Sequence, residues 1–292
     1  MDKVTYKFLS CSAPPEEADV ILFGAPYDGT VSFRPGTRFG PSAVRPDSYG
    51  LEMYSPYLDD EITNYRTADI GDLVMPFGDQ VLALDRICGQ VKEIIDAGKK
   101  PLMIGGEHLV TLGAVRALAE KYPDLHIIHL DAHTDLRDEF FDVSLSHATV
   151  LKKCYDILGD GRIFQFGIRS GERAEFEWAA AGHTYLHKHD LETLDEVCEK
   201  LKDKPKDKPV YITIDLDVFD PSVFPGTGTP EPGGITFKEM MWGYRQFCRL
   251  NHIVGADLVE LAPNYDTSGV STAVACKCCR EMILVLNRAG KQ

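Results

Sequence analysis

The sequence predicts an α/β fold: a single domain of three layers, in which helices cover both faces of a doubly wound, mainly parallel sheet. Two observations carry this prediction. Short apolar runs rich in β-branched residues alternate with longer stretches of helical period, and such alternation is typical of parallel strands joined by helical crossovers. No repeat, low-complexity tract or long linker divides the chain, so we assign residues 1–292 to one domain.

Strands buried between two helix layers read as continuous apolar runs, because both of their faces are covered. Six such runs are predicted as strands: 19–23, 101–104, 125–131, 162–169, 210–217 and 253–260. Helices are predicted at 79–98, at 110–120, through residue 155, and at 175–181, 237–248 and 272–287. A shorter helix is predicted near Ala43, with Ser42 as its N-cap and Pro46 limiting its length.

The composition excludes several classes of partner. A formal charge of −14, from 45 acidic and 31 basic residues, argues against a nucleic-acid or anionic-membrane partner and is compatible with a cationic substrate. No apolar run approaches the roughly 20 residues of a membrane span. Residues 1–6 lack the basic-then-apolar pattern of a secretory signal, so we expect a cytoplasmic protein.

The eight cysteines are scattered, which in such a chain favours reduced core thiols over a disulfide framework. Cys276 and Cys279 form a C-x-x-C pair, but they lie inside the predicted helix at 272–287. No second cysteine pair completes a zinc site, so we expect both to be structural.

Side chains suited to metal binding follow the strand at 125–131. Asp131, His133 and Asp135 are spaced two apart, which in an extended chain puts all three on one face. Two carboxylates and an imidazole that converge repel one another and lose hydration unless a cation lies between them. The alternative for Asp135 is a helix N-cap.

Two further strands end in residues of the same kind. The strand at 210–217 ends with Asp215 and Asp217, and the strand at 101–104 runs into His108. Ligands of open parallel sheets bind at the carboxyl ends of the strands, so we expect these side chains to converge there. The alternative for His108 is a histidine bonded to the backbone.

The candidate ligands together suit two divalent cations. They are His108, Asp131, His133, Asp135, Asp215 and Asp217. Four carboxylates are too many for one ion, and carboxylate with imidazole but no thiolate favours manganese over zinc. Two ions about 3.5–4 Å apart would hold a hydroxide between them as a hydrolytic nucleophile.

Several motifs, in order and spacing, resemble the ureohydrolase family of arginases and agmatinases. They are Gly105-Gly106-Glu107-His108, Asp131-Ala132-His133-Thr134-Asp135, Ser146-His147, Asp215-Leu216-Asp217, Asp220-Pro221-Ser222, residues 225–230 and Asp257-Leu258-Val259-Glu260. The resemblance runs from about Gly24 to the C-terminal helix and is greatest to bacterial agmatinases.

The resemblance implies an arginase-type fold, two Mn²⁺ ions per subunit, a homo-oligomer of three or six chains, and hydrolysis of agmatine to putrescine and urea. It implies that His108, Asp131, Asp135 and Asp215 bind one ion, and that Asp131, His133, Asp215 and Asp217 bind the other. It further implies that Asp135 orients the bridging hydroxide, His147 shuttles protons, Glu260 holds the guanidinium and Thr229 lines its pocket.

One residue departs from the family pattern. Many members have Asp where this chain has Glu107, before the ligating histidine. We interpret the change as altering hydrogen bonding around His108 without removing a ligand.

The loop after the D-x-H-x-D motif is expected to select the group at the far end of the substrate. It carries Asp138, Glu139 and Asp142, with Phe140 and Phe141 between them. We expect its acids, Asp138 and Glu139 among them, to line the pocket mouth and to favour a substrate ammonium over a carboxylate, the alternative being that they point to water. The competing functions are another amidino-hydrolase such as a guanidinobutyrase, and an inactive metal-binding regulatory protein.

Overall fold

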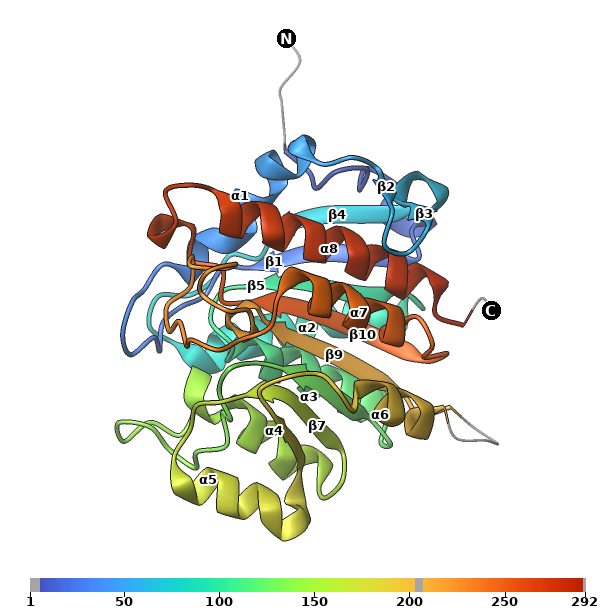
Figure 1. Cartoon of the computed structure of the whole chain (residues 1–292). Coiled ribbons are helices and arrows are strands. Elements are labelled where there is room, and N and C mark those ends of the chain that lie inside the picture. Colours follow the sequence, from blue (N-terminus) through green and yellow to red (C-terminus); the bar gives the residue numbers. More distant parts are fainter. Residues whose placement is uncertain (1–5, 203–206, 291–292) are drawn as a thin grey trace.

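The computed structural model describes residues 6–202 and 207–290, and within them the central feature is an eight-stranded sheet (Figure 1). Its strands are β1 (Val20–Ala25), β4 (Thr67–Asp72), β5 (Lys100–Gly105), β6 (His126–Leu130), β7 (Ile163–Ile168), β8 (Tyr185–Lys188), β9 (Val210–Asp215) and β10 (Ile253–Val259). A separate hairpin is formed by β2 (Tyr54–Ser55) and β3 (Asp60–Glu61).

The strands of the large sheet are parallel and follow the order β4-β1-β5-β10-β9-β6-β7-β8. β10 comes last in the sequence and lies between β5 and β9. Pairing of Ile104 with Leu258 and of Val259 with Asp215 aligns the carboxyl ends of β5, β10 and β9. Because β6 pairs in step with β9, the residues that follow these four strands lie side by side at one edge.

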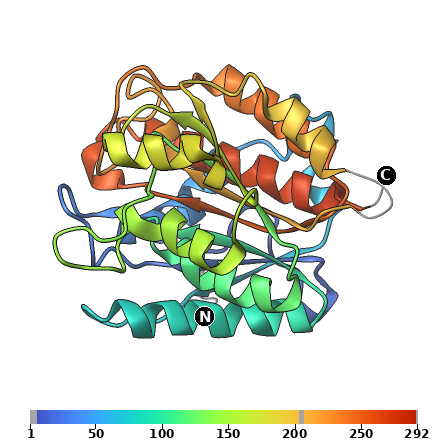
Figure 2. The ribbon, with the colours of Figure 1, turned by 90° about the horizontal axis from the view of Figure 1, so that it is seen from below.

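Helices cover both faces of the sheet. They are α1 (Gly40–Asp47), α2 (Gln80–Asp96), α3 (Val110–Lys121), α4 (Val150–Leu158), α5 (Arg173–Trp178), α6 (Leu194–Leu201), α7 (Phe237–Phe247) and α8 (Val270–Arg288). Figure 2 shows α2, α3 and α4 on one side of the sheet and α6, α7 and α8 on the other, and each layer encloses its own hydrophobic cluster. The predicted three-layer, doubly wound fold is confirmed.

Every predicted strand and helix is present, with ends shifted by at most three residues. The prediction of Ser42 as an N-cap was wrong, because α1 begins at Gly40 and Ser42 lies within it. The strands and helices that the sequence reasoning missed are β4, β8, α6 and the two short strands of the hairpin, β2 and β3. β4 and β8 form the two edges of the sheet, where partly exposed strands need no continuous apolar run. In α6 the signal was present, because Leu194, Val197, Cys198 and Leu201 have helical spacing and are all buried.

The cysteines occupy the places expected of structural thiols. All eight lie in the described residues, and none is joined in a disulfide. Cys276 and Cys279 are buried in α8, and burial raises the pKa of Cys276 to about 12. No helix of residues 6–202 and 207–290 is long and apolar enough to cross a membrane.

Candidate metal centre and active site

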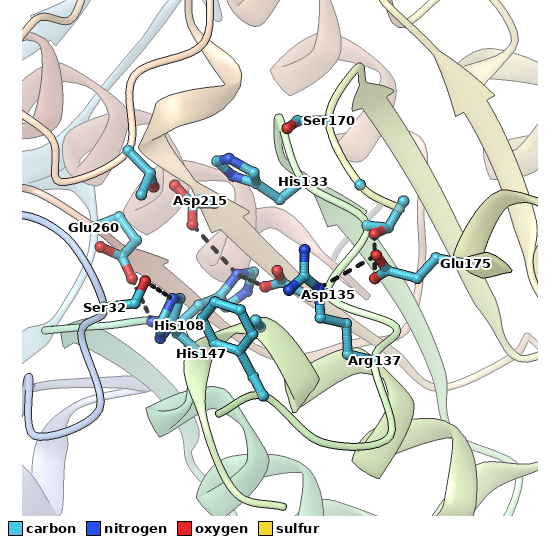
Figure 3. Close-up of a pocket in the computed structure, with 15 residues that line it drawn as sticks. Ser32, His108, His133, Asp135, Arg137, His147, Ser170, Glu175, Asp215 and Glu260 are labelled. Atoms are coloured by element: carbon cyan, nitrogen blue, oxygen red, sulfur yellow. Dashed lines mark hydrogen bonds and ion pairs between the residues drawn. The ribbon is translucent and has the colours of Figure 1, made fainter. Parts of the chain in front are cut away.

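His108 lies just after β5, with its ring buried at the carboxyl edge of the sheet. Its Nδ1 lies 3.2 Å from a carboxylate oxygen of Asp135 and 3.4 Å from one of Asp215 (Figure 3). It also lies 3.0 Å from a carboxylate oxygen of Asp131. Among the described residues this nitrogen has no hydrogen-bond partner. A buried ring nitrogen that faces three carboxylates without bonding to them is well placed to bind a cation.

The hydrogen bond at the other ring nitrogen of His108 determines which nitrogen carries the hydrogen in the neutral ring. Nε2 lies 2.9 Å from the hydroxyl of Thr213, and that hydroxyl donates to Asp257 across 2.6 Å. The hydroxyls of Tyr211 and Thr111 donate to the same carboxylate. Because Thr213 uses its hydrogen toward Asp257, it accepts the Nε2–H of His108, and Nδ1 presents a lone pair to the carboxylates.

Asp131 also belongs to a second group, which it forms with His133 and Asp217. The Nδ1 of His133 lies 3.0 Å from Asp217 and 3.5 Å from Asp131. The two groups are adjacent and share Asp131, so the geometry offers two neighbouring positions for cations. All six candidate ligands from the sequence are brought together here, since Asp215 also lies beside His108.

The acidic motifs reach the site through turns, so the prediction that their side chains share one face of an extended strand was wrong. β6 ends at Leu130, and Asp135 has a φ of 53°, in the left-handed region. β9 ends at Asp215, where a 3₁₀ turn begins and the N–H of Asp217 donates to the Asp215 carboxylate across 2.8 Å. The ends of β6 and β9 place these residues at the edge of the sheet, and the turns orient their side chains toward the site.

The carboxylates oppose one another's ionisation. Burial and the charge of Asp131 raise the pKa of Asp135 to about 7. Burial, followed by the charges of Asp217 and Asp131, raises the pKa of Asp215 well above its ordinary value. Although burial opposes it, the same carboxylates raise the pKa of His108 well above the usual range. Divalent cations would relieve this repulsion, and donors of carboxylate and imidazole type fit two of them.

His129, a buried residue of β6, belongs to the first group and was missed from the sequence. Its Nε2 lies 2.8 Å from Asp131, and its Nδ1 lies 3.1 Å from the amide nitrogen of Gln165. Because the Gln165 amide donates to Nδ1, Nε2 carries the hydrogen and donates it to Asp131. His129 therefore orients that carboxylate, and its position two residues before Asp131 on a strand was the available signal.

A cavity of about 220 Å³ opens beside the two groups, and the predicted residues His147, Glu260 and Thr229 line it (Figure 3). Oε1 of Glu260 accepts the N–H of His108 across 2.8 Å, and the Thr229 hydroxyl lies 3.3 Å from Asp217. Burial, followed by the charge of Asp217, raises the pKa of Glu260 well above its ordinary value. Burial, followed by a charge on His133, lowers the pKa of His147 to about 4.

Asp138 and Glu139 lie outside this cavity. Both are exposed and line a neighbouring cavity of about 630 Å³, which shares Arg137, Phe140 and Glu175 with the first. Arg137 is the charged residue of this loop that reaches the first cavity, held 3.4 Å from Glu172 and 3.5 Å from Glu175. Arg137, Ser32, Ser170 and Glu175 were not predicted as lining residues, because no motif marks them.

Comparison with known proteins agrees with these observations. Residues 18–285 match the arginase family. An agmatinase of Bacillus anthracis is 50% identical over 92% of both chains, and one of Bacillus subtilis is 47% identical over 95% of both. A solved structure of a Clostridium difficile protein has a TM-score of 0.91 and 48% identity, and the match covers 94% of this chain and 99% of that one.

A parallel α/β sheet whose edge gathers carboxylates and imidazoles around a small cavity is typical of a metal-dependent hydrolase. The comparisons make this assignment specific, because they span nearly the whole chain. This chain belongs to the arginase family, and the ureohydrolase resemblance is confirmed.

Proposed function

We propose that this protein is an agmatinase, which hydrolyses agmatine to putrescine and urea and so serves polyamine biosynthesis. The observation that carries the proposal is the convergence, beside one small cavity, of two carboxylate–imidazole groups with Glu260 and His147. Relatives that are 47–50% identical to this chain over more than nine tenths of both chains are agmatinases.

The six converging residues would hold two Mn²⁺ ions. One ion would be bound by His108, Asp131, Asp135 and Asp215, and the other by Asp131, His133, Asp215 and Asp217. Manganese accepts this mixture of donors, whereas Mg²⁺ prefers oxygen ligands and soft thiolates, which favour zinc, are missing from the set. When bound, paired ions lower the pKa of water and stabilise developing negative charge. Asp135 lines the cavity, where it can also accept a hydrogen bond from the attacking water.

Glu260 is proposed to hold the guanidinium of the substrate. One of its oxygens accepts the N–H of His108, while the other has no hydrogen bond to the described residues. A carboxylate pairs with a planar guanidinium through charge-assisted hydrogen bonds, and a bound cation favours the ionised form of Glu260. Thr229 also lines this cavity, so its side chain would contact the guanidinium held by Glu260.

His147 is proposed to carry a proton to the leaving amine, which cannot depart readily without one. Its Nδ1 is buried and has no hydrogen-bond partner among the described residues, and its Nε2 lies 3.3 Å from the Ser32 hydroxyl. The ring therefore has no strong structural partner. An imidazole in this position can take up a proton at one nitrogen and release it again.

The far end of agmatine is an ammonium, and the neighbouring cavity offers it a negatively charged surface. Asp138, Glu139 and Asp142 line that cavity, and Arg137 at its boundary is already paired with two glutamates. We place the ammonium on this side of the site. Negative charge there disfavours substrates whose tail ends in a carboxylate.

Side-by-side urea assays on agmatine, arginine and 4-guanidinobutyrate test the proposal. Agmatine is expected to exceed the other two in kcat/KM by at least about 10²-fold, or about 2.7 kcal/mol. A preference for 4-guanidinobutyrate would reassign the protein as a guanidinobutyrase. No urea from any of the three, with manganese bound, would favour the inactive regulatory alternative, which the presence of all six donors and His147 disfavours.

We further propose that the protein is cytoplasmic and forms a homo-oligomer of three or six chains. The buried thiols suit a reducing compartment. Sedimentation equilibrium gives the number of chains, and cell fractionation gives the compartment.

A further inference from the structure

Glu107 is a fully buried carboxylate beside the site, and neither metal binding nor substrate binding uses it. Its side chain makes no hydrogen bond to His108, which corrects the interpretation drawn from the sequence. Instead it receives two hydrogen bonds from Thr30. The N–H of Thr30 donates to Oε2 across 2.9 Å, and the hydroxyl donates to Oε1 across 2.7 Å.

Thr30 connects this carboxylate to His147. The Thr30 hydroxyl donates its hydrogen to Glu107, so its oxygen can still accept a hydrogen bond. It accepts one from the backbone N–H of His147 across 3.1 Å. Two residues further along, the Ser32 hydroxyl lies 3.3 Å from Nε2 of the same histidine. The segment 30–32 therefore contacts His147 at both its backbone and its ring, and Figure 3 shows the ring contact with Ser32.

This segment is anchored against the end of β5. The N–H of Glu107 donates to the carbonyl of Tyr27 across 2.8 Å. Gly106 permits the approach, since a Cβ at this position would lie 2.0 Å from the Tyr27 carbonyl oxygen. Glu107 is thus fixed at its backbone to the chain that leads into Thr30, and at its carboxylate to Thr30 itself.

We propose that Glu107 and Thr30 are positioning residues, which hold His147 where it can transfer a proton to the leaving amine. The inference rests on the proposed function, because it assigns a task to the neighbours of the proton carrier. Neither residue lines the cavity, so both act through His147. A displacement of a reacting group by about 1 Å can cost roughly 10²-fold in rate, which is the size of effect expected here.

Thr30→Val tests the inference, because valine keeps the shape of threonine and removes the hydroxyl. In the manganese-loaded enzyme, kcat for agmatine should fall by about 10–10²-fold while KM changes by less than about threefold. Metal content should stay at two ions per chain. Thr30→Ser keeps the hydroxyl and should restore kcat to within about threefold of the wild-type value. Unchanged kcat in Thr30→Val would overturn the inference.

A double-mutant cycle shows whether the effect passes through His147. With the proton carrier removed by His147→Asn, adding Thr30→Val should cost little more, because the two residues act as a unit. If the two losses simply multiply, Thr30 does not act through His147. Glu107→Asp keeps the charge and shortens the reach toward Thr30, and its loss of kcat should likewise disappear in the His147→Asn background.

A spectroscopic readout separates this inference from the proposed function. In ¹⁵N-labelled protein, the imidazole signals of His147, assigned through their loss in His147→Asn, should shift in Thr30→Val and return in Thr30→Ser. A shift without urea release from agmatine in the wild-type enzyme would refute the agmatinase proposal and leave the positioning contact standing. Identical signals in all three proteins would overturn the positioning role whatever the substrate is.

Discussion

The hydroxyl of Thr213 accepts a hydrogen bond from Nε2 of His108 across 2.9 Å, at the side of the ring that faces away from the carboxylates. The Thr213 hydroxyl donates its hydrogen to Asp257, so it can only accept in its bond with His108. The nitrogen that faces Asp131, Asp135 and Asp215 is thereby left with a lone pair that can bind a cation.

Thr213→Val should therefore weaken metal binding. Losing the partner of a ligating histidine typically costs about 10–10²-fold in metal affinity, and this range is expected here. Thr213→Ser, which keeps the hydroxyl, should bind nearly as well as the wild-type protein. Competition with a chromophoric chelator measures all three affinities. Equal affinities for the valine and serine variants would show that the Thr213 contact does not control the ring.

Removal of the metal should abolish urea production and lower the thermal midpoint. At a free metal concentration of about 100 times Kd, binding stabilises the folded chain by about 2.7 kcal/mol, roughly 4 °C in a chain of this size. Adding back Mn²⁺ should restore activity far better than Mg²⁺, because imidazole ligands suit manganese. Metal analysis, calorimetry and urea assays check this, and full activity in metal-free protein would contradict the site.

Asp215→Asn should be almost inactive, because Asp215 is proposed to contact both ions. The carboxylate also accepts the N–H of Asp217, a bond that the asparagine oxygen can keep, so the turn after β9 should survive. The expected result is a folded protein with weakened metal binding. Circular dichroism and metal analysis, measured beside the urea assay, distinguish this outcome from simple unfolding.

Glu260→Gln should retain the metals and lose substrate. The glutamine oxygen can still accept the N–H of His108, so the loop between β10 and α8 should keep its shape. A neutral amide cannot form the charge-assisted pair with a guanidinium, and kcat/KM for agmatine should fall by at least about 10²-fold. Steady-state kinetics with metal analysis decide the matter: a variant that loses its metals would show that Glu260 belongs to the metal centre.

Asp220→Asn should lower stability in a manner that depends on pH. Asp220 accepts from the hydroxyl and N–H of Ser222 and from the N–H groups of Gly233 and Gly234, and these bonds lower its pKa to about 2. A carboxylate with a depressed folded pKa stabilises the fold above its unfolded pKa, about 4, and loses that contribution as pH falls through about 2.

The free energy of unfolding of Asp220→Asn should therefore be lower than that of the wild-type protein near neutral pH, and the difference should shrink between about pH 4 and pH 2. Urea denaturation over this range measures it. A difference that stays constant down to about pH 2 would mean that ionisation of Asp220 does not stabilise the folded chain.

The fold and the identity of the six converging residues could be predicted from sequence because both depend on local signals. Buried strands leave continuous apolar runs, and carboxylates placed directly after such runs are costly without a cation. Asp131 and Asp215 are marked in this way. The route by which Asp135 and Asp217 enter the site was not predictable, since a positive φ and a 3₁₀ turn leave no such mark.

Residues that contact the site from distant parts of the sequence were not predicted, for a different reason. Thr213 contacts His108, 105 positions away, and Thr30 contacts His147, 117 positions away. Only the strand order brings these pairs together, and a threonine in a strand or loop is chemically unremarkable. Asp138 and Glu139 were expected at the pocket mouth because they follow the metal motif, and this stays a prediction: they line the neighbouring cavity, where Lys152 of α4 lies 3.4 Å from Asp138.

The position of β10 has a consequence for how the protein is made. β5 is joined to the rest of the sheet only through β1 and β10, and the four strands β9-β6-β7-β8 lie beyond β10. A chain still on the ribosome, synthesised as far as residue 252, therefore holds two separate ribbons with open edges. Such edges can pair with other chains and aggregate. Arrival of the last strand closes the gap and brings in Glu260, so the sheet and, under the proposed function, the guanidinium-binding carboxylate are completed in a single late event.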